Sequence, residues 1–274
     1  MQSQRPTPEL AGLSAQERRI LGAFVANEKV VIRAGDVQEI HPVSRKAANL
    51  LLSRLHQKGW LRRLKRGVYG PVPLESETTQ PAVENAWLLA MELFAPCYIS
   101  GWSAAEHWDL TEQVFNSISL VTGHPQRSSS RTIAGVPFRT RTIAPERIFG
   151  TSRIWIGSRT VEVADRHRLI VDVLDAPEFG GGCRHTLDVV DEYWKSEHHD
   201  AQKLLEYALR YGRGAVLKRM GFCAERSGAV SSEWLDEVEV NLTKGVIRLD
   251  PQGATGGRLN RRWQVKVNVP MTSM

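Results

Sequence analysis

The stretch SRKAANLLLSRLHQKGWLRRLKRGVYGPVP, residues 44–73, decides how the first part of the chain folds. Ser44 suits a helix N-cap, and Gly59 suits the end of the same helix. Between them, apolar residues repeat at the spacing of one buried helix face; they are Ala48, Leu51, Leu52 and Leu55. Two strand-like runs follow, residues 60–64 and 68–72, and Gly67 between them suits a hairpin tip. The stretch therefore predicts a helix over residues 45–58 and then a basic hairpin.

Three shorter elements are predicted before this helix. Ser14 and Glu17 have the spacing of a capping box, so a helix should begin after Ser14 and end near Asn27. Residues 29–32 are β-branched and strand-like, and residues 33–40 suit a short helix that stops before Pro42. The order helix, short strand, helix, helix, hairpin is that of a winged helix-turn-helix. In such a domain the third helix enters the major groove of DNA, and a basic wing contacts phosphates or the adjacent minor groove.

The distribution of charge points to a polyanionic partner for this part of the chain. The whole chain has a net charge of +6, yet residues 1–73 hold 13 Lys and Arg against 5 Asp and Glu, and residues 74–274 have a net charge of −2. Eight Lys or Arg and no carboxylate lie between Glu39 and Glu75. An asymmetry of this size favours nucleic-acid binding by the first part of the chain.

The candidate DNA contacts lie on the exposed face of the third helix and on the hairpin. The helix contributes Ser44, Arg45, Lys46, Asn49, Ser53 and Arg54, and the hairpin contributes Arg62, Arg63, Lys65 and Arg66. Arg45 and Asn49 have side chains that read guanine and adenine edges, and Arg66 at the hairpin tip suits insertion into the minor groove. An ordinary solvated helix face is the alternative interpretation, although the acidic i,i+4 partners of such a face are missing.

The length of 274 residues favours two domains. We expect the winged helix over residues 1–73 and a larger C-terminal domain over residues 81–274, joined by the polar residues 74–80. No apolar run approaches the roughly 18 residues of a membrane span, and the N-terminus has no signal-peptide core, so a cytoplasmic location is expected. Cys97, Cys183 and Cys223 form no CxxC pair, which disfavours a disulfide framework or a structural zinc site.

The second domain is predicted to be α+β, because its strands and helices are segregated along the chain and do not alternate. We expect helices at residues 81–95, 186–194, 201–211, 215–222 and 232–242, and another that starts after Asp165 and buries one face. A brief strand and a helix share residues 97–110, with a capping box at Ser103 and Glu106. Further strands are expected at residues 117–122 and 262–269. Two hairpins are expected, one at residues 132–143 about a turn at 135–137 and one at residues 154–163 about a turn at 157–158.

No motif in the second domain carries a specific chemistry. Its histidines form no HxxxH or HxH pair, it has no GxSxG elbow, and the glycines at 180–182 lack the Lys and Ser/Thr of a phosphate loop. We therefore expect no metal, no cofactor and no catalysis. The enzymatic alternative is a metal-dependent nuclease, in which Asp250 and Gln264 bind Mg²⁺ and Lys266 steadies the attacking water.

A second basic stretch crosses the predicted strands of this domain. Its arginines are Arg127, Arg131, Arg139, Arg141, Arg147 and Arg153, set against Glu146 alone. Arg139 and Arg141 share one face of a predicted strand, because side chains alternate along it. The stretch is either a second phosphate-binding surface or a solvated strand face.

Several segments in the same order resemble the AbiEi family, the transcriptional-regulator antitoxins of abortive-infection toxin–antitoxin systems. They are RGVY (residues 66–69), YISGWSAAEHWDL (98–110), VADRHRLIVDVLDAPEFGG (163–181), KRMGF (218–222) and the closing LDP and RWQVKVN (249–251 and 262–268). The resemblance covers roughly residues 14–270.

The resemblance implies a division of labour between the two domains. The N-terminal winged helix would bind inverted repeats in double-stranded DNA at its own promoter and repress the operon. The C-terminal domain would counteract a nucleotidyltransferase-like toxin, and a stable complex between the two proteins is not assumed. We therefore expect a non-enzymatic repressor antitoxin, with the nuclease and a protein-interaction module that binds RNA or an acidic partner as the alternatives.

Overall fold

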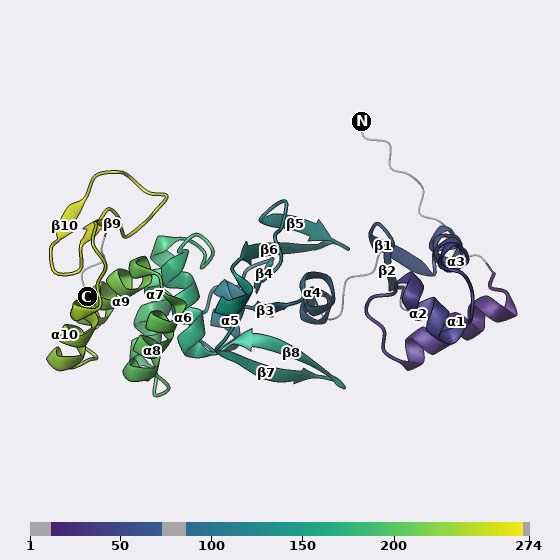
Figure 1. Ribbon diagram of the computed structural model, residues 1–274, viewed down its shortest axis with the longest axis horizontal. Coiled ribbons are helices and arrows are strands. Elements are labelled where there is room, and N and C mark those ends of the chain that lie inside the picture. Colours follow the sequence, from purple (N-terminus) through teal and green to yellow (C-terminus); the bar gives the residue numbers. More distant parts are fainter. Residues whose placement is uncertain (1–11, 73–85, 271–274) are drawn as a thin grey trace. The chain divides into compact units, whose positions relative to one another are not determined.

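The computed structural model describes residues 12–72 and 86–270 (Figure 1). Contacts divide the chain into two compact units, one of Met1–Leu93 with Arg131–Pro137 and the other of Phe94–Ser130 with Phe138–Met274. The fold is α+β, as predicted, with an N-terminal winged helix-turn-helix and a larger mixed part. The predicted linker, residues 74–80, and the first residues of the helix predicted at 81–95 lie outside the described residues. The domain limits of 1–73 and 81–274 therefore remain predictions.

The N-terminal elements follow the predicted order. They are α1 (Ala15–Ala26), α2 (Ala34–Ile40), α3 (Arg45–Gln57), β1 (Leu61–Lys65) and β2 (Val68–Pro71). The strand predicted at residues 29–32 is reduced to one isolated bridge, in which Ile32 and Tyr69 exchange hydrogen bonds of 2.7 and 2.9 Å. The chain enters α2 directly after Arg33, so only one residue pair is left to extend the β1–β2 hairpin.

The buried side chains of α1, α2 and α3 form one core that also holds the hairpin. Ile20, Phe24 and Leu52 lie in this core, and Tyr69 joins it from β2. Glu17 is buried at the start of α1, completes the capping box with Ser14, and accepts a 2.7 Å hydrogen bond from Lys58 at the end of α3. This hydrogen bond lowers the pKa of Glu17. The pair therefore ties the start of the domain to the residue that caps α3.

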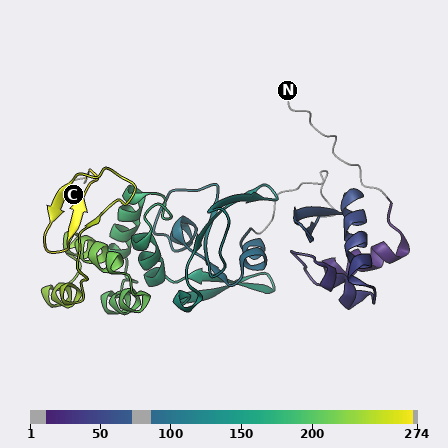
Figure 2. The same ribbon diagram turned by 45° about the horizontal axis from the view of Figure 1, so that its top comes forward.

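A six-stranded mixed sheet organises the second part of the chain (Figure 2). Its order is β5 (Ser130–Ile133), β6 (Val136–Thr142), β4 (Ile118–Thr122), β3 (Cys97–Ile99), β8 (Arg159–Ala164) and β7 (Thr151–Ile156). β3 pairs antiparallel with β4 and parallel with β8, while β4 pairs parallel with β6. The two predicted hairpins are therefore the two edges of the sheet.

A second, small sheet near the C-terminus was mostly missed from the sequence. Its order is β10 (Arg258–Asn260), β11 (Val265–Val267) and β9 (Ile247–Arg248). The strand predicted at residues 262–269 is wrong in its first half, because residues 261–264 form a turn in which Trp263 is buried completely. The apolar residues of this segment alternate with polar ones partly because Trp263 is buried in the turn and Val265 is buried in the strand.

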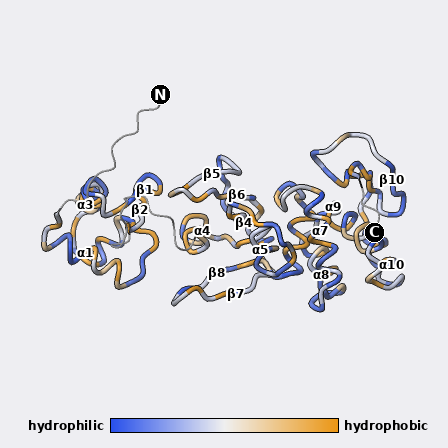
Figure 3. The backbone as a smooth tube through the Cα atoms, turned by 180° about the vertical axis from the view of Figure 1, so that it is seen from behind, coloured by the Kyte–Doolittle hydropathy of each residue, from blue (hydrophilic) through white to orange (hydrophobic). Residues whose placement is uncertain are grey.

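Seven helices lie in the described part of residues 86–270. They are α4 (Ala86–Phe94), α5 (Gly101–His107), α6 (Arg166–Asp175), α7 (Cys183–Lys195), α8 (Ala201–Tyr211), α9 (Gly214–Ser227) and α10 (Ser232–Val240). In Figure 3 the colour of α8 changes between hydrophobic and hydrophilic, as expected of a helix with one buried face. The capping box predicted at Ser103 is wrong. Ser100 is the N-cap of α5, and Ser103 lies inside the helix, where its hydroxyl accepts a 2.9 Å hydrogen bond from the amide of Ser119.

Helix α6 is buried on all sides, not on the single face that the sequence suggested. Residues 167–174 are all buried, and the helix contacts α5, α7, α8 and α9. Within it, the Nη2 atom of Arg168 lies 3.0 Å from Oδ1 of Asp172, and both side chains are fully buried. The carboxylate also accepts hydrogen bonds from Tyr98 (3.0 Å) and Ser100 (2.7 Å). Arg168 in turn donates to the Tyr98 hydroxyl at 2.6 Å and to the carbonyl of Arg147 at 2.8 Å.

The aromatic rings around Arg168 complete its environment. Its guanidinium carbon lies 4.6 Å from the ring centre of Phe149 and 4.8 Å from that of Tyr211. Burial acts against the charge of this guanidinium, but the Asp172 carboxylate outweighs it and raises the pKa of Arg168. Each of the two buried groups therefore depends on the other to offset the cost of its burial.

Replacing Asp172 with Asn should destabilise the second part of the protein by about 3 to 5 kcal/mol, because it leaves the Arg168 charge buried without a counter-charge. The measurement is the midpoint of urea unfolding followed by circular dichroism. Glu192→Gln is the matched control, since Glu192 pairs with Lys195 at 2.7 Å on the exposed surface and the midpoint should stay where it is. An Asp172→Asn midpoint equal to that of the control would show that the buried pair contributes nothing.

Candidate nucleic-acid interface

Helix α3 presents the predicted contact residues along its exposed side. Arg45, Lys46, Asn49 and Arg54 are exposed, and Ser53 is half-buried. Ser44 is the N-cap: its hydroxyl accepts a 3.2 Å hydrogen bond from the amide of Ala47. The buried side of the helix, which carries Leu52 and Leu55, fixes the orientation of the exposed one. The amphipathic pattern of the sequence thus places the basic side chains of α3 and the side-chain amide of Asn49 on its exposed side.

The wing is the β1–β2 hairpin, and Gly67 turns it with a φ of +72° that favours glycine. Arg63, Lys65 and Arg66 are exposed, whereas Arg62 is half-buried. Arg62 faces Gly70 across the hairpin, and a Cβ atom on Gly70 would lie 3.5 Å from its Nε atom. Burial lowers the pKa of Arg62. Arg62 therefore lies against the hairpin, while the other three bases extend the basic surface.

The exposed Lys and Arg side chains of α3 and the wing form no ion pair in the described part of this domain, whereas Lys29 and Arg33 elsewhere in it pair with Asp36 and Glu92. Within residues 12–72 no ion pair involves Arg45, Lys46, Arg54, Arg63, Lys65 or Arg66. Lys58, the C-cap of α3, differs from them because it pairs with Glu17. Unpaired cations on one surface raise the local concentration of polyanions and attract DNA phosphates.

Sequence reasoning missed one exposed residue on α3. Leu50 is 61 % exposed and follows Asn49 directly. An apolar side chain at this place suits contact with the methyl group of thymine. The signal was present, because Leu50 lies outside the buried periodicity of Ala48, Leu52 and Leu55.

The residues of the nuclease alternative lie in the small C-terminal sheet and in the loop after β9. Oδ1 of Asp250 accepts a 2.9 Å hydrogen bond from the amide of Gln252, and Lys266 is exposed on β11. No group of three or more His, Cys, Asp or Glu is placed to hold a metal ion in the part of the chain that the structure describes. Asp250 instead stabilises the loop after β9, with its amide bonded to the side chain of Asn268 at 2.9 Å.

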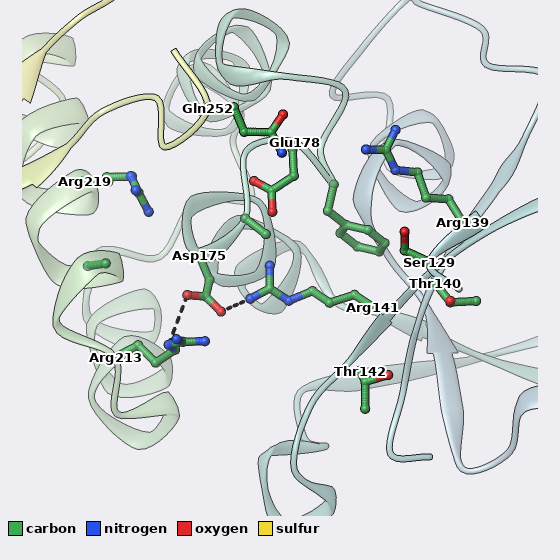
Figure 4. A pocket seen from close by; sticks show the side chains of 13 residues that line it. Ser129, Arg139, Thr140, Arg141, Thr142, Asp175, Glu178, Arg213, Arg219 and Gln252 are labelled. Carbon is green, nitrogen blue, oxygen red and sulfur yellow. Dashed lines mark hydrogen bonds and ion pairs between the residues drawn. The ribbon is translucent and has the colours of Figure 1, made fainter. Parts of the chain in front are cut away.

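The second basic stretch is divided between different surroundings. Arg127 is exposed in the loop after β4, and Arg131 is half-buried on β5. Arg139 and Arg141, which the sequence placed on one strand face, both line a pocket in the second unit (Figure 4). Arg141 forms an ion pair with Asp175 of α6. The stretch is therefore not one continuous surface of free cations.

Together these features define a class: an α+β protein that carries an N-terminal winged helix with an unpaired basic face. Residues 19–72 match the family described as transcriptional regulator, AbiEi antitoxin. Over residues 19–72 this match confirms the resemblance to AbiEi antitoxins, and it supports a DNA-binding antitoxin. No curated protein matches the sequence.

Among solved structures, the fold is similar to the crystal structure of the RV2827C protein from Mycobacterium tuberculosis. The TM-score is 0.62 at 14% sequence identity, and the similarity covers 93% of this chain and 92% of that chain. The shared fold extends through the part beyond residue 72. None of the helices within residues 12–72 and 86–270 is long and apolar enough to cross a bilayer.

Removing the wing tip should weaken DNA binding without regard to sequence. The Lys65→Ala/Arg66→Ala double variant loses two cations of the wing tip, so the slope of log K against log salt should fall by about 1 for each. Mobility-shift titrations of upstream and random duplexes over a salt series measure this. Arg153→Ala, which removes an exposed arginine of β7 paired with Glu162, is the control. Equal affinity of the wing variant and wild type at physiological salt would contradict the assignment of the wing.

Asn49→Ala should instead relax sequence preference. Because the Asn49 amide can read an adenine edge and carries no charge, binding to random duplex should be retained while binding to the preferred duplex weakens by about 1 to 3 kcal/mol. Competition of labelled upstream DNA with random duplex measures the ratio of the two affinities. A ratio unchanged from wild type would remove Asn49 from the base-reading residues.

Proposed function

We propose that the protein is a repressor-type antitoxin that binds inverted repeats at its own promoter through the winged helix. The observation that carries the proposal is the unpaired basic face formed by α3 and the wing tip. The AbiEi match over residues 19–72 covers these same elements. Repression then follows from occupancy of the promoter.

In this proposal α3 lies in the major groove and the wing lies beside it. Arg45, Lys46 and Asn49 reach bases or nearby phosphates from the first turns of α3. Arg63 and Lys65 contact phosphates, and Arg66 enters the minor groove, since it is exposed beside Gly67 at the hairpin tip. Arg62, which lies against the hairpin, has a supporting part in shaping the wing.

We assign the second part of the protein to the antitoxin activity. It would counteract a nucleotidyltransferase-like toxin, and a stable complex between the two proteins is not required. The family match supports an antitoxin role for the chain, and the non-catalytic assignment agrees with the regulatory character of the family.

The two activities should separate in cells. With a reporter behind the promoter of this gene, the Lys65→Ala/Arg66→Ala variant should lose repression that wild type provides. When a neighbouring nucleotidyltransferase-like gene is induced, both proteins should restore growth, because neutralisation is assigned to the second part. Failure of wild type to restore growth, or retained repression by the variant, would contradict the corresponding half of the proposal.

Incubation with plasmid DNA and Mg²⁺ or Mn²⁺ separates the regulator from the nuclease alternative. Intact plasmid is the expected result. Cleavage that disappears in Lys266→Ala would replace the regulatory assignment with an enzymatic one.

A further inference from the structure

A polar pocket of about 650 Å³ lies in the second unit, among β6, the end of α6 and the start of α9 (Figure 4). Its volume falls within the range of small-molecule sites, about 300 to 1,000 Å³. The charged residues that line it are Arg139, Arg141, Arg213, Arg219, Asp175 and Glu178. Four cations against two carboxylates leave an excess of positive charge, and hydroxyl and amide side chains supply further hydrogen-bonding groups.

One of the two carboxylates is already neutralised. The Asp175 side chain is 3% exposed and pairs with Arg141 and, at 3.4 Å, with Arg213. It also accepts a 2.7 Å hydrogen bond from the hydroxyl of Tyr211. Burial opposes the charge of Arg141, but the nearby Asp175 carboxylate raises its pKa. Asp175 thus holds Arg141 and Arg213 at the wall of the pocket, and the three side chains together keep a net charge of +1.

The remaining two arginines have no carboxylate partner among the described residues. Arg219 is buried, and its guanidinium donates to the carbonyls of Leu174, Arg248 and Leu249. Its charge is fixed in place, and it contributes to the potential of the pocket. Arg139 makes no side-chain hydrogen bond or ion pair within residues 86–270, and its guanidinium carbon lies 5.3 Å from the ring centre of Trp102. Trp102 therefore orients a guanidinium whose donors are available to a ligand.

Glu178 gives the pocket a second kind of recognition. Its Oε2 atom is buried and has no hydrogen-bond partner in the described structure. A buried carboxylate oxygen without a partner is costly, and a donor on a bound molecule would satisfy it. In Figure 4, Glu178 lies beside Gln252 among the residues that line the pocket.

We propose that this pocket binds a small phosphorylated molecule that also carries hydroxyl or amino donors, of the size of a nucleotide. Arg139 and Arg141 contact the phosphate, because guanidinium groups match its oxygens in bidentate geometry. Glu178 accepts a hydrogen bond from the donor-bearing part of the molecule. The pocket lies in the second unit and contains none of the α3 and wing residues that are assigned to DNA binding.

The test is isothermal titration calorimetry of the full chain with the four nucleoside 5′-triphosphates, ribose 5-phosphate, inorganic phosphate and uncharged adenosine. At least one organic phosphate should bind with a Kd of about 1 mM or tighter, and adenosine should not bind. Arg139→Ala should weaken this binding by about tenfold or more, since it removes a charge-assisted contact. Arg153→Ala, an arginine of the same sheet outside the pocket, should bind as wild type does.

Two further variants distinguish ligand recognition from loss of folding. Arg139→Lys keeps the charge without the fork of donors and should fall between wild type and Arg139→Ala. Glu178→Gln should weaken the organic phosphate more than inorganic phosphate. Binding of no phosphorylated probe, or equal binding by Arg139→Ala and Arg153→Ala, would overturn the proposal. Loss of DNA affinity in Arg139→Ala without small-molecule binding would overturn it as well and assign the pocket to nucleic acid.

Discussion

The buried pair of Arg168 and Asp172 is the constraint on which the second part of the protein depends. Two charges removed from water are stable there only because Tyr98, Ser100 and the Arg147 carbonyl satisfy their remaining donors and acceptors. These partners come from β3, from the residue after it and from the turn before β7, so the pair fixes α6 against the sheet. Asp175 lies about one turn after Asp172 on α6, so its position is fixed together with that of the helix. The Arg168–Asp172 pair thus helps to position the wall of the arginine-rich pocket, although neither residue lines the pocket.

The winged helix distributes its charges in the opposite way. Glu17 is buried and pairs with Lys58, and this pair joins the start of α1 to the C-cap of α3. Within residues 12–72, the exposed Lys and Arg side chains of α3 and the wing tip form no ion pair. Attraction between these exposed cations and a polyanion is weak at each residue and is screened by salt, so it acts through the sum of the charges. Paired charges in this domain stabilise the fold, and unpaired ones are left for recognition.

Local signals in the sequence were sufficient for most elements and failed where tertiary contacts decide. The capping boxes illustrate both results: Ser14 caps α1, whereas the same spacing at Ser103 lies inside α5 because Gly101 and Ser100 start that helix earlier. Periodicity placed α6 correctly but predicted one buried face, since Arg168 and Asp172 read as surface residues until their partners from β3 are known. The strand predicted over 262–269 includes Trp263, whose burial in a turn mimics the alternation of a strand. These errors share a cause, which is that packing between distant segments can override a local pattern.

The functional residues show the same limit more sharply. The bases of α3 and the wing could be placed from the sequence because one helix and one hairpin carry them all, and local periodicity fixes their common face. Arg139 and Arg141 could be placed on one strand face for the same reason, but their roles could not be told apart. Arg141 pairs with Asp175, which lies 34 residues further along the chain. Arg139 lies over the ring of Trp102 and forms no ion pair within residues 86–270. The net charge of the sequence does not distinguish the two arginines. In the structure, Arg141 is held by Asp175 at the wall of the pocket, whereas the guanidinium of Arg139 is available to a ligand. The strand pairing and the position of α6 thus decide which of the two arginines pairs with a carboxylate. Neither can be predicted from the local sequence.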